Sequence, residues 1–130
     1  MAHHFEFDLE NKILLVVMEG EVDGREIQES NARIREHVEK LKPVAGIGDF
    51  TAVTKLTVSS SVLRSTALQP SPYPDETPRF IVAPTDYLFG MARMYELVAD
   101  RPQAALRVVR TREAALAELG VKNARFERVR

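Results

Sequence analysis

Two patterns of apolar residues alternate along this chain. Residues 13–18 form an uninterrupted apolar run, which is typical of a strand buried on both faces. Ile27, Ile34 and Val38 then fall on one face of a helix, with charged residues on the opposite face. Segments of both kinds recur towards the end of the chain. Strands that alternate with helices favour right-handed crossovers and a mainly parallel sheet, so we expect an α/β fold.

Turn and capping residues mark where the expected elements begin and end. Residues 5–9 alternate with period two, which predicts an edge strand in a hairpin with 13–18. Asp23 and Glu26 have the spacing of a capping box at the start of the first helix, and Pro43 ends that helix. Further strands are expected at 44–49, 80–83 and 106–109, and further helices at 58–68, from Thr85 or Asp86, and from Thr111 to Gly120. The predicted fold is a single-layer, mainly parallel sheet of about five strands with an N-terminal antiparallel hairpin and four helices.

Length and composition favour one domain. The chain has 130 residues, of which 45% are apolar, and this is enough for one hydrophobic core. We expect a single domain over residues 1–130, with its core at 4–120 and a basic tail at 121–130. Residues 101–130 hold seven arginines and one lysine against three glutamates, a net charge of +5. Such a basic end either contacts an acidic partner or forms a solvated surface, and we favour the surface.

The same composition excludes several classes of function. A chain without cysteine has no disulfide, thiol nucleophile or thiolate metal site. Its net charge of −1 argues against generic nucleic-acid binding. The longest apolar run is far shorter than the ~20 residues that span a bilayer, and the N-terminus lacks the pattern of a signal peptide. We therefore expect a cytoplasmic protein without a membrane span. The absence of phosphate-loop, dinucleotide and zinc motifs predicts no bound cofactor or metal ion.

Catalytic groups are sparse in this sequence. His37 lies off the apolar stripe of its helix, which predicts a solvent-exposed side chain rather than the base of a Ser-His-Asp triad. Asp49 and Asp86 could form a carboxylate pair for acid–base chemistry or for a hard metal ion, but their spacing is not diagnostic. We therefore expect a protein that is not an enzyme.

Polar residues gather where the predicted parallel strands end. In open α/β sheets, ligands bind beyond the carboxyl ends of the strands, where helix N-termini favour anions and polar groups. One strand is followed by Asp49 and Thr51, another by Thr85 and Asp86, and three serines at 59–61 begin a helix. The simpler interpretation is that these side chains only cap helices. The candidate binding residues of this polar corner are Asp49, Thr51, Ser59, Ser60, Thr85 and Asp86.

The stretch that contains these serines resembles a known signature. The letters DFTAV at 49–53, followed by TVSS at 57–60, are similar to the D-L-S-x-V-x-x-x-D-S-S-G motif of STAS domains. Over about residues 4–120, including IVAPTDYLFGMARMYE and VVRTREAALAELG, the chain resembles the SpoIIAA-like bacterial proteins, small STAS-related domains grouped with the CRAL-TRIO lipid carriers. In STAS antagonists the second serine of the motif accepts a phosphate, and this position falls on Ser59. The chain departs from the motif at the three neighbouring positions, where threonine, valine and serine replace aspartate, serine and glycine.

The residues and the resemblance together support three hypotheses. The first is a non-enzymatic, STAS-like binding and regulatory module that contacts an unknown protein partner or a small anionic ligand through the polar corner, as a monomer or a homodimer. The alternative is a carrier of a small lipophilic ligand, in which the proline-rich loop from Pro70 to Pro78 and the helix face 88–94 cover an apolar pocket. A pocket of about 300 Å³ or more would favour the carrier. The weakest hypothesis is a hydrolase that uses Asp49 or Asp86.

Overall fold

Strands and helices alternate along the chain in this computed structural model. The structure describes residues 2–99 and 105–130. The elements in chain order are β1 (His3–Asp8), β2 (Ile13–Asp23), α1 (Gly24–Leu41), β3 (Ala45–Thr57), α2 (Ser60–Leu68), β4 (Arg79–Val82), α3 (Asp86–Ala99), β5 (Leu106–Val109), α4 (Arg112–Glu118) and β6 (Glu127–Val129). Within these residues the predicted α/β class, the N-terminal hairpin and the four helices are confirmed.

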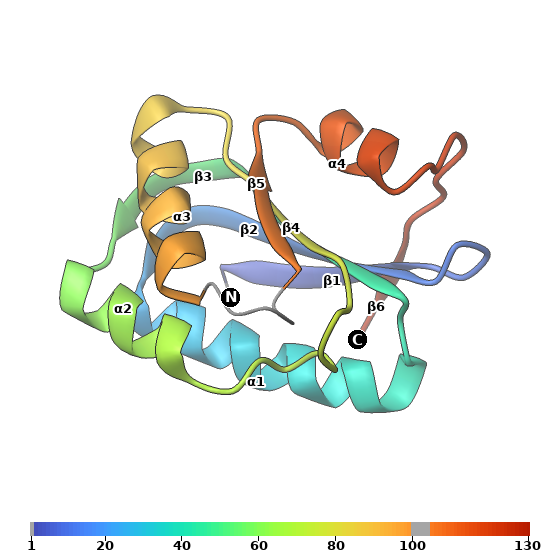
Figure 1. The fold of residues 1–130 in the computed structure, drawn as a ribbon, viewed down its shortest axis with the longest axis horizontal. Coiled ribbons are helices and arrows are strands. Elements are labelled where there is room, and N and C mark those ends of the chain that lie inside the picture. The colour runs from blue at the N-terminus through green and yellow to red at the C-terminus, as the bar shows by residue number, and fades with distance from the viewer. Residues whose placement is uncertain (1, 100–104) are drawn as a thin grey trace.

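One mixed sheet holds the described strands, in the order β5-β4-β3-β2-β1-β6. β2, β3, β4 and β5 are parallel neighbours, whereas β1 is antiparallel to both β2 and β6. The sixth strand lies within 121–130, the segment that we expected to be a tail. It pairs with β1, with Val129 opposite Phe5, so the C-terminal segment lies against the N-terminal hairpin (Figure 1).

β3 is much longer than the strand expected at 44–49. It runs for 13 residues and stays paired with β2 to its end, where Thr57 lies opposite Asp23. The pairing register shifts so that Thr54 is an extra residue between Val53, opposite Gly20, and Lys55, opposite Glu21. Because of this bulge, inward-facing residues of β3 lie three positions apart. They do not show the period-two alternation that predicts a strand, so the sequence does not reveal this part of β3.

Helices cover the two faces of the sheet unequally. α1, α2 and α3 lie on one side, and the short α4 lies on the other (Figure 1). On the first side Phe5 and Leu14 pack in one cluster with Ile34 and Val38 of α1. On the second side the buried Ala115 of α4 packs in a cluster with side chains from four parallel strands, namely Ile13, Leu15, Ala45, Ile47, Phe80, Val82 and Val109. These two apolar layers supply the main driving force for folding.

His37 is buried, so the prediction that its side chain is solvent-exposed is wrong. Its ring stacks on Phe5, with the ring centroids 4.3 Å apart. Nδ1 lies 2.8 Å from the carbonyl oxygen of Arg33, and Nε2 lies 2.7 Å from the carbonyl oxygen of Arg130. The second partner is 93 positions away in the chain, so the pattern of the helix alone could not show it.

Asp8 holds the C-terminal segment against the hairpin. Its carboxylate accepts hydrogen bonds from the backbone N–H groups of Glu10, Asn11 and Arg125 and from the side-chain amide of Asn11. Burial by itself raises the pKa of this carboxyl, but the hydrogen bonds outweigh it and hold the pKa of Asp8 below its ordinary value of 3.8. The ionised side chain therefore fastens the segment that leads into β6.

Candidate functional site

The Asp49 carboxylate forms an ion pair and hydrogen bonds with other residues of the chain. It is buried at the end of the β3 segment that pairs with β4. Its Oδ2 accepts a hydrogen bond from Arg112 Nε at 3.0 Å and forms an ion pair with Arg112 Nη2 at 2.9 Å. Its Oδ1 accepts from the backbone N–H of Thr51 at 2.9 Å and from the Thr51 hydroxyl. Arg112 opens α4, so this ion pair ties α4 to the sheet. Both carboxylate oxygens have donors within the chain.

Thr85 and Asp86 begin α3 beside the neighbouring strand. The Thr85 hydroxyl oxygen accepts from the N–H of Leu88 at 3.2 Å, which is the contact of a helix cap. Asp86 is exposed and pairs with Arg110 at 3.0 Å. Each of the two aspartates named as a carboxylate pair thus has its own arginine.

The serines lie at the start of α2, after the end of β3. Ser59 is the N-cap of α2, as predicted, and its hydroxyl oxygen accepts from the N–H of Val62 at 3.2 Å. The eight strand residues that follow Asp49 in β3 carry the chain along a path of roughly 26 Å before it reaches Ser59 and Ser60. β3 stays paired with β2 over these residues, so the serines lie further along the chain's path than Asp49 and Thr51.

An apolar cavity lies between the sheet and the helices α1 and α3, on the side of the sheet away from α4. Its volume is about 140 Å³. Its floor includes Gly46 and Gly48 of β3, and the missing side chain of Gly48 leaves space on the face that α1 and α3 cover. Other parts of its wall are Val16 and Met18 of β2, Ile27 and Ile34 of α1, Ile81 of β4, and Leu88, Met91 and Ala92 of α3. The sequence does indicate such a gap, because two glycines two positions apart in a strand lie on the same face of the sheet.

Tyr73 of the proline-rich loop lines one side of this cavity. The ring is buried over Gly46 so closely that a Cβ on that residue would lie 2.2 Å from the tyrosine hydroxyl oxygen. Burial raises the pKa of Tyr73 far above its ordinary value, more than the nearby Arg79 charge lowers it, so the hydroxyl stays neutral. The loop is also held at its end, where the Pro78 carbonyl oxygen accepts from the N–H of Gly46 at 3.0 Å.

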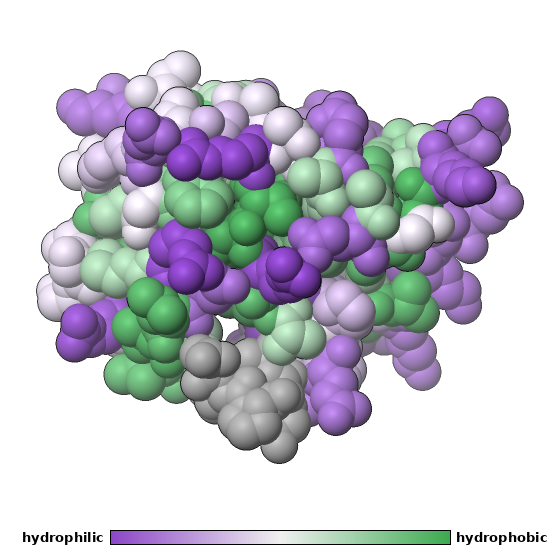
Figure 2. Space-filling model, turned by 45° about the horizontal axis from the view of Figure 1, so that its top comes forward, coloured by the Kyte–Doolittle hydropathy of each residue, from purple (hydrophilic) through white to green (hydrophobic). Residues whose placement is uncertain are grey.

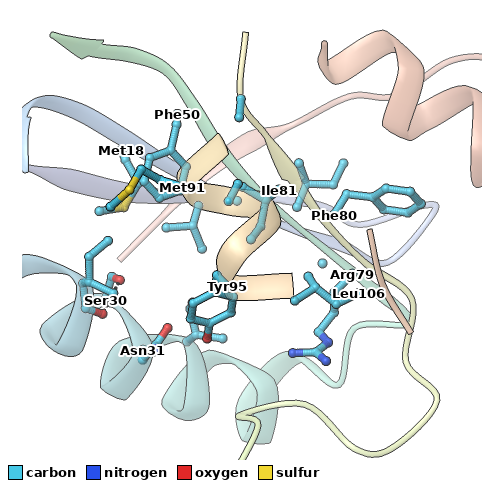
Figure 3. A pocket seen from close by; sticks show the side chains of 18 of the residues that line it. Met18, Ser30, Asn31, Phe50, Arg79, Phe80, Ile81, Met91, Tyr95 and Leu106 are labelled. Atoms are coloured by element: carbon cyan, nitrogen blue, oxygen red, sulfur yellow. Dashed lines mark hydrogen bonds between the residues drawn. The ribbon is translucent and has the colours of Figure 1, made fainter. Parts of the chain in front are cut away.

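The cavity has an apolar end and a polar end. Figure 3 shows Met18, Phe50 and Met91 gathered at one end. The polar tips of Asn31, Tyr95 and Arg79 lie at the other, towards α1. A molecule in this space would therefore meet apolar carbon at one end and hydrogen-bonding groups at the other.

A second space, the polar hollow, adjoins that polar end. It has a volume of about 170 Å³ and shares Asn31, Pro72, Arg79 and Tyr95 with the wall of the apolar cavity. Its remaining wall comes from α1, from the end of α2 and from the loop, and includes Gln28, Arg35, Thr66, Gln69 and Ser71. Among the described residues that line it, two are arginines and none is an aspartate or glutamate.

Other kinds of site find less support in the structure. In residues 2–99 and 105–130, no group of three or more histidine, cysteine or acidic side chains is placed to hold a metal ion. No helix in the same residues is long and apolar enough to cross a bilayer. Hydrophilic side chains dominate the face formed by α3, β5 and α4, with smaller apolar groups between them (Figure 2). In comparisons with known proteins, the chain matches no protein-family model and no curated protein.

Proposed function

We propose that this protein binds a small, mainly apolar molecule in the cavity beneath the loop 70–78. The observation that carries the proposal is the space of about 140 Å³ beside Gly48, on the face of the sheet that α1 and α3 cover. Protein cores are otherwise packed as densely as organic crystals, with few voids larger than a water molecule. The cavity is smaller than the ~300 Å³ typical of sites for drug-sized ligands. It is close to an engineered cavity of about 150 Å³ that binds benzene, so we expect a ligand body of about that size.

The proposed role is non-enzymatic binding, as the resemblance to STAS-related proteins implies, but at a different place. The candidate residues Asp49, Thr51 and Thr85 make hydrogen bonds within the chain. Ser59 is a helix cap, which is its simpler interpretation. The face of the sheet that α1, α2 and α3 cover is therefore the better candidate for the binding surface than the strand ends.

The affinity expected for a purely apolar ligand is modest. Six buried carbons contribute roughly 5 kcal/mol, at about 0.8 kcal/mol for each CH₂ group. This free energy corresponds to a Kd of the order of 0.1 to 1 mM. Such binding is measurable by titration but would need additional polar contacts to become tight.

The test is a titration of ¹⁵N-labelled protein with 1-hexanol, followed by amide chemical shifts. We expect saturable shifts at Gly48, Ile81 and Ala92, which line the cavity from strands and helix. The Gly48→Val variant should remove them, because a Cβ at this position meets nothing closer than 3.9 Å and the two further carbons would occupy the space.

The matched control is Gly90→Ala. Gly90 is an exposed residue of α3 with no atom within 4 Å of an added Cβ, so this change should leave hexanol binding intact. Shifts that are absent from the cavity, or that persist unchanged in Gly48→Val, would contradict the proposal.

A further inference from the structure

We infer that the protein docks on the surface of a lipid bilayer with anionic head groups, through the end of the molecule that carries the N-terminal hairpin turn. Three chain segments meet at this end: the hairpin turn 9–12, the link 42–44 between α1 and β3, and the link 122–125 before β6. Together they are called the turn surface below. Docking of this kind does not require a ligand in the cavity.

Hydrogen bonds hold the three segments of the turn surface together. The N–H of Val44 donates to the carbonyl oxygen of Lys12 at 2.8 Å, which joins the link 42–44 to the hairpin turn. The N–H of Arg125 donates to the carboxylate of Asp8, directly before that turn, at 3.1 Å. Figure 1 shows the three segments at one end of the molecule, away from α2. Side chains from distant parts of the sequence therefore share one surface.

Cationic side chains outnumber acidic ones on the turn surface. Lys12, Lys42, Lys122 and Arg125 are exposed, and Glu10 is the one acidic residue of the three segments, so their net charge is +3. The whole chain has a net charge of −1. Residues 2–99 and 105–130 provide no ion-pair partner for any of the four cations. The turn surface therefore has a local positive charge that attracts an anionic surface.

Two of these lysines occupy backbone positions that suit glycine better. Lys12 has a φ of 56° and Lys42 a φ of 49°, both in the left-handed region. Glycine adopts this conformation without steric cost, whereas a residue with a side chain is strained there. Strain of this kind clusters at functional sites. The turn geometry gives no reason for lysine at these positions, but contact with an anionic surface does.

Apolar side chains project beside the cations. Leu9 is 77% exposed, the highest fraction for a large apolar side chain among the described residues, and Val44 is 58% exposed. Leu9 lies in the same turn as Lys12, and Val44 follows two positions after Lys42. At a bilayer, such apolar tips enter the boundary of the acyl chains while the lysine ammonium groups stay among the head groups. An acidic protein would neutralise the cations but would give the exposed Leu9 and Val44 no role, so the bilayer is the better match.

The experiment is co-sedimentation of the full chain with large unilamellar vesicles at pH 7. Vesicles of phosphatidylcholine with about 30% phosphatidylglycerol are compared with vesicles of phosphatidylcholine alone. We expect saturable binding to the anionic vesicles and at least about tenfold weaker binding to the neutral ones, because each lysine or arginine near an anionic surface adds to the affinity. Raising the salt concentration from about 0.1 M to about 0.5 M should weaken the binding several-fold by screening.

The variants separate docking from folding. Lys12→Gly and Lys42→Gly each remove a charge and relieve the left-handed backbone, so neither should lower the melting temperature. Each should lower the vesicle partition coefficient about fivefold, and Leu9→Ser should lower it about tenfold or more. The matched controls are Lys55→Gln in β3 and Leu68→Ser in α2, which change exposed residues outside the turn surface. Both should bind the vesicles as the unchanged protein does.

Every outcome decides for or against docking on a bilayer. Equal binding to the two kinds of vesicle, binding to neither, or unchanged binding by the lysine variants would overturn the inference. If the lysine variants lose binding but Leu9→Ser retains it in full, the contact is purely electrostatic. Such a contact fits an acidic protein surface, and the bilayer would then be the wrong partner.

Discussion

Replacing Gly46 by alanine should force Tyr73 away from the sheet. An added Cβ would lie 2.2 Å from the tyrosine hydroxyl oxygen and 2.4 Å from Cζ, well inside van der Waals contact. Gly46 belongs to β3, which is paired with β2 on one side and β4 on the other, so the strand cannot move away. The ring and the loop that carries it must move instead.

The magnitude follows from the cost of overpacking. An extra methyl group in a well-packed site costs about 1–3 kcal/mol of unfolding free energy. Tyr73→Ala by itself removes a buried ring and should cost about 3–5 kcal/mol. In the double variant the methyl group of residue 46 enters the space that the ring has left. The double variant should therefore be more stable than the sum of the two single changes predicts, by about 1–3 kcal/mol.

The assay is urea unfolding, followed by circular dichroism, of the unchanged protein, the two single variants and the double variant. Gly48→Ala is the control, because its Cβ would have no neighbour closer than 3.9 Å and should not be destabilising. Changes at sites that do not interact add to within about 0.5 kcal/mol. Additivity of Gly46→Ala and Tyr73→Ala within that limit would refute the contact and, with it, the place of Tyr73 in the cavity wall.

Three other changes test the structural contacts described above, each by urea or thermal unfolding. Arg112→Gln should lower the unfolding free energy by about 3 kcal/mol, because it leaves the buried Asp49 carboxylate without a cation; a change below 1 kcal/mol would show that the pair is not structural. Asp8 has a lowered pKa, so its contribution is fully present above the ordinary value of 3.8 and is lost as the pH falls below it. The difference in stability between the unchanged protein and Asp8→Asn should therefore shrink between pH 5 and about pH 2, and a constant difference would contradict the assignment. Ser59→Ala should cost about 1 kcal/mol through loss of the helix cap, whereas Ser59→Asp should cost little; equal losses in both would mean that the side chain does not cap.

The sequence by itself determined those parts of the fold that depend on residues a few positions apart. The apolar run 13–18 predicts a fully buried strand, and the structure has it inside β2 with both faces covered. Asp23, Ser59 and Thr111 each cap the helix that follows, by accepting from an N–H group three residues on. These interactions are local, so the spacing of the residue types is enough to predict them.

Only the tertiary structure decided which distant side chains meet. Asp49 belonged to the predicted polar corner, yet it is held by Arg112, 63 positions away. His37 Nε2 lies 2.7 Å from the carbonyl oxygen of Arg130, at the far end of the chain. The cavity depends on Gly46 facing Tyr73, on the bulge that turns Val53 and Leu56 to the same side, and on the helices that close it. Such a space is the volume left when separately formed elements pack together, and no local pattern of residues encodes that volume.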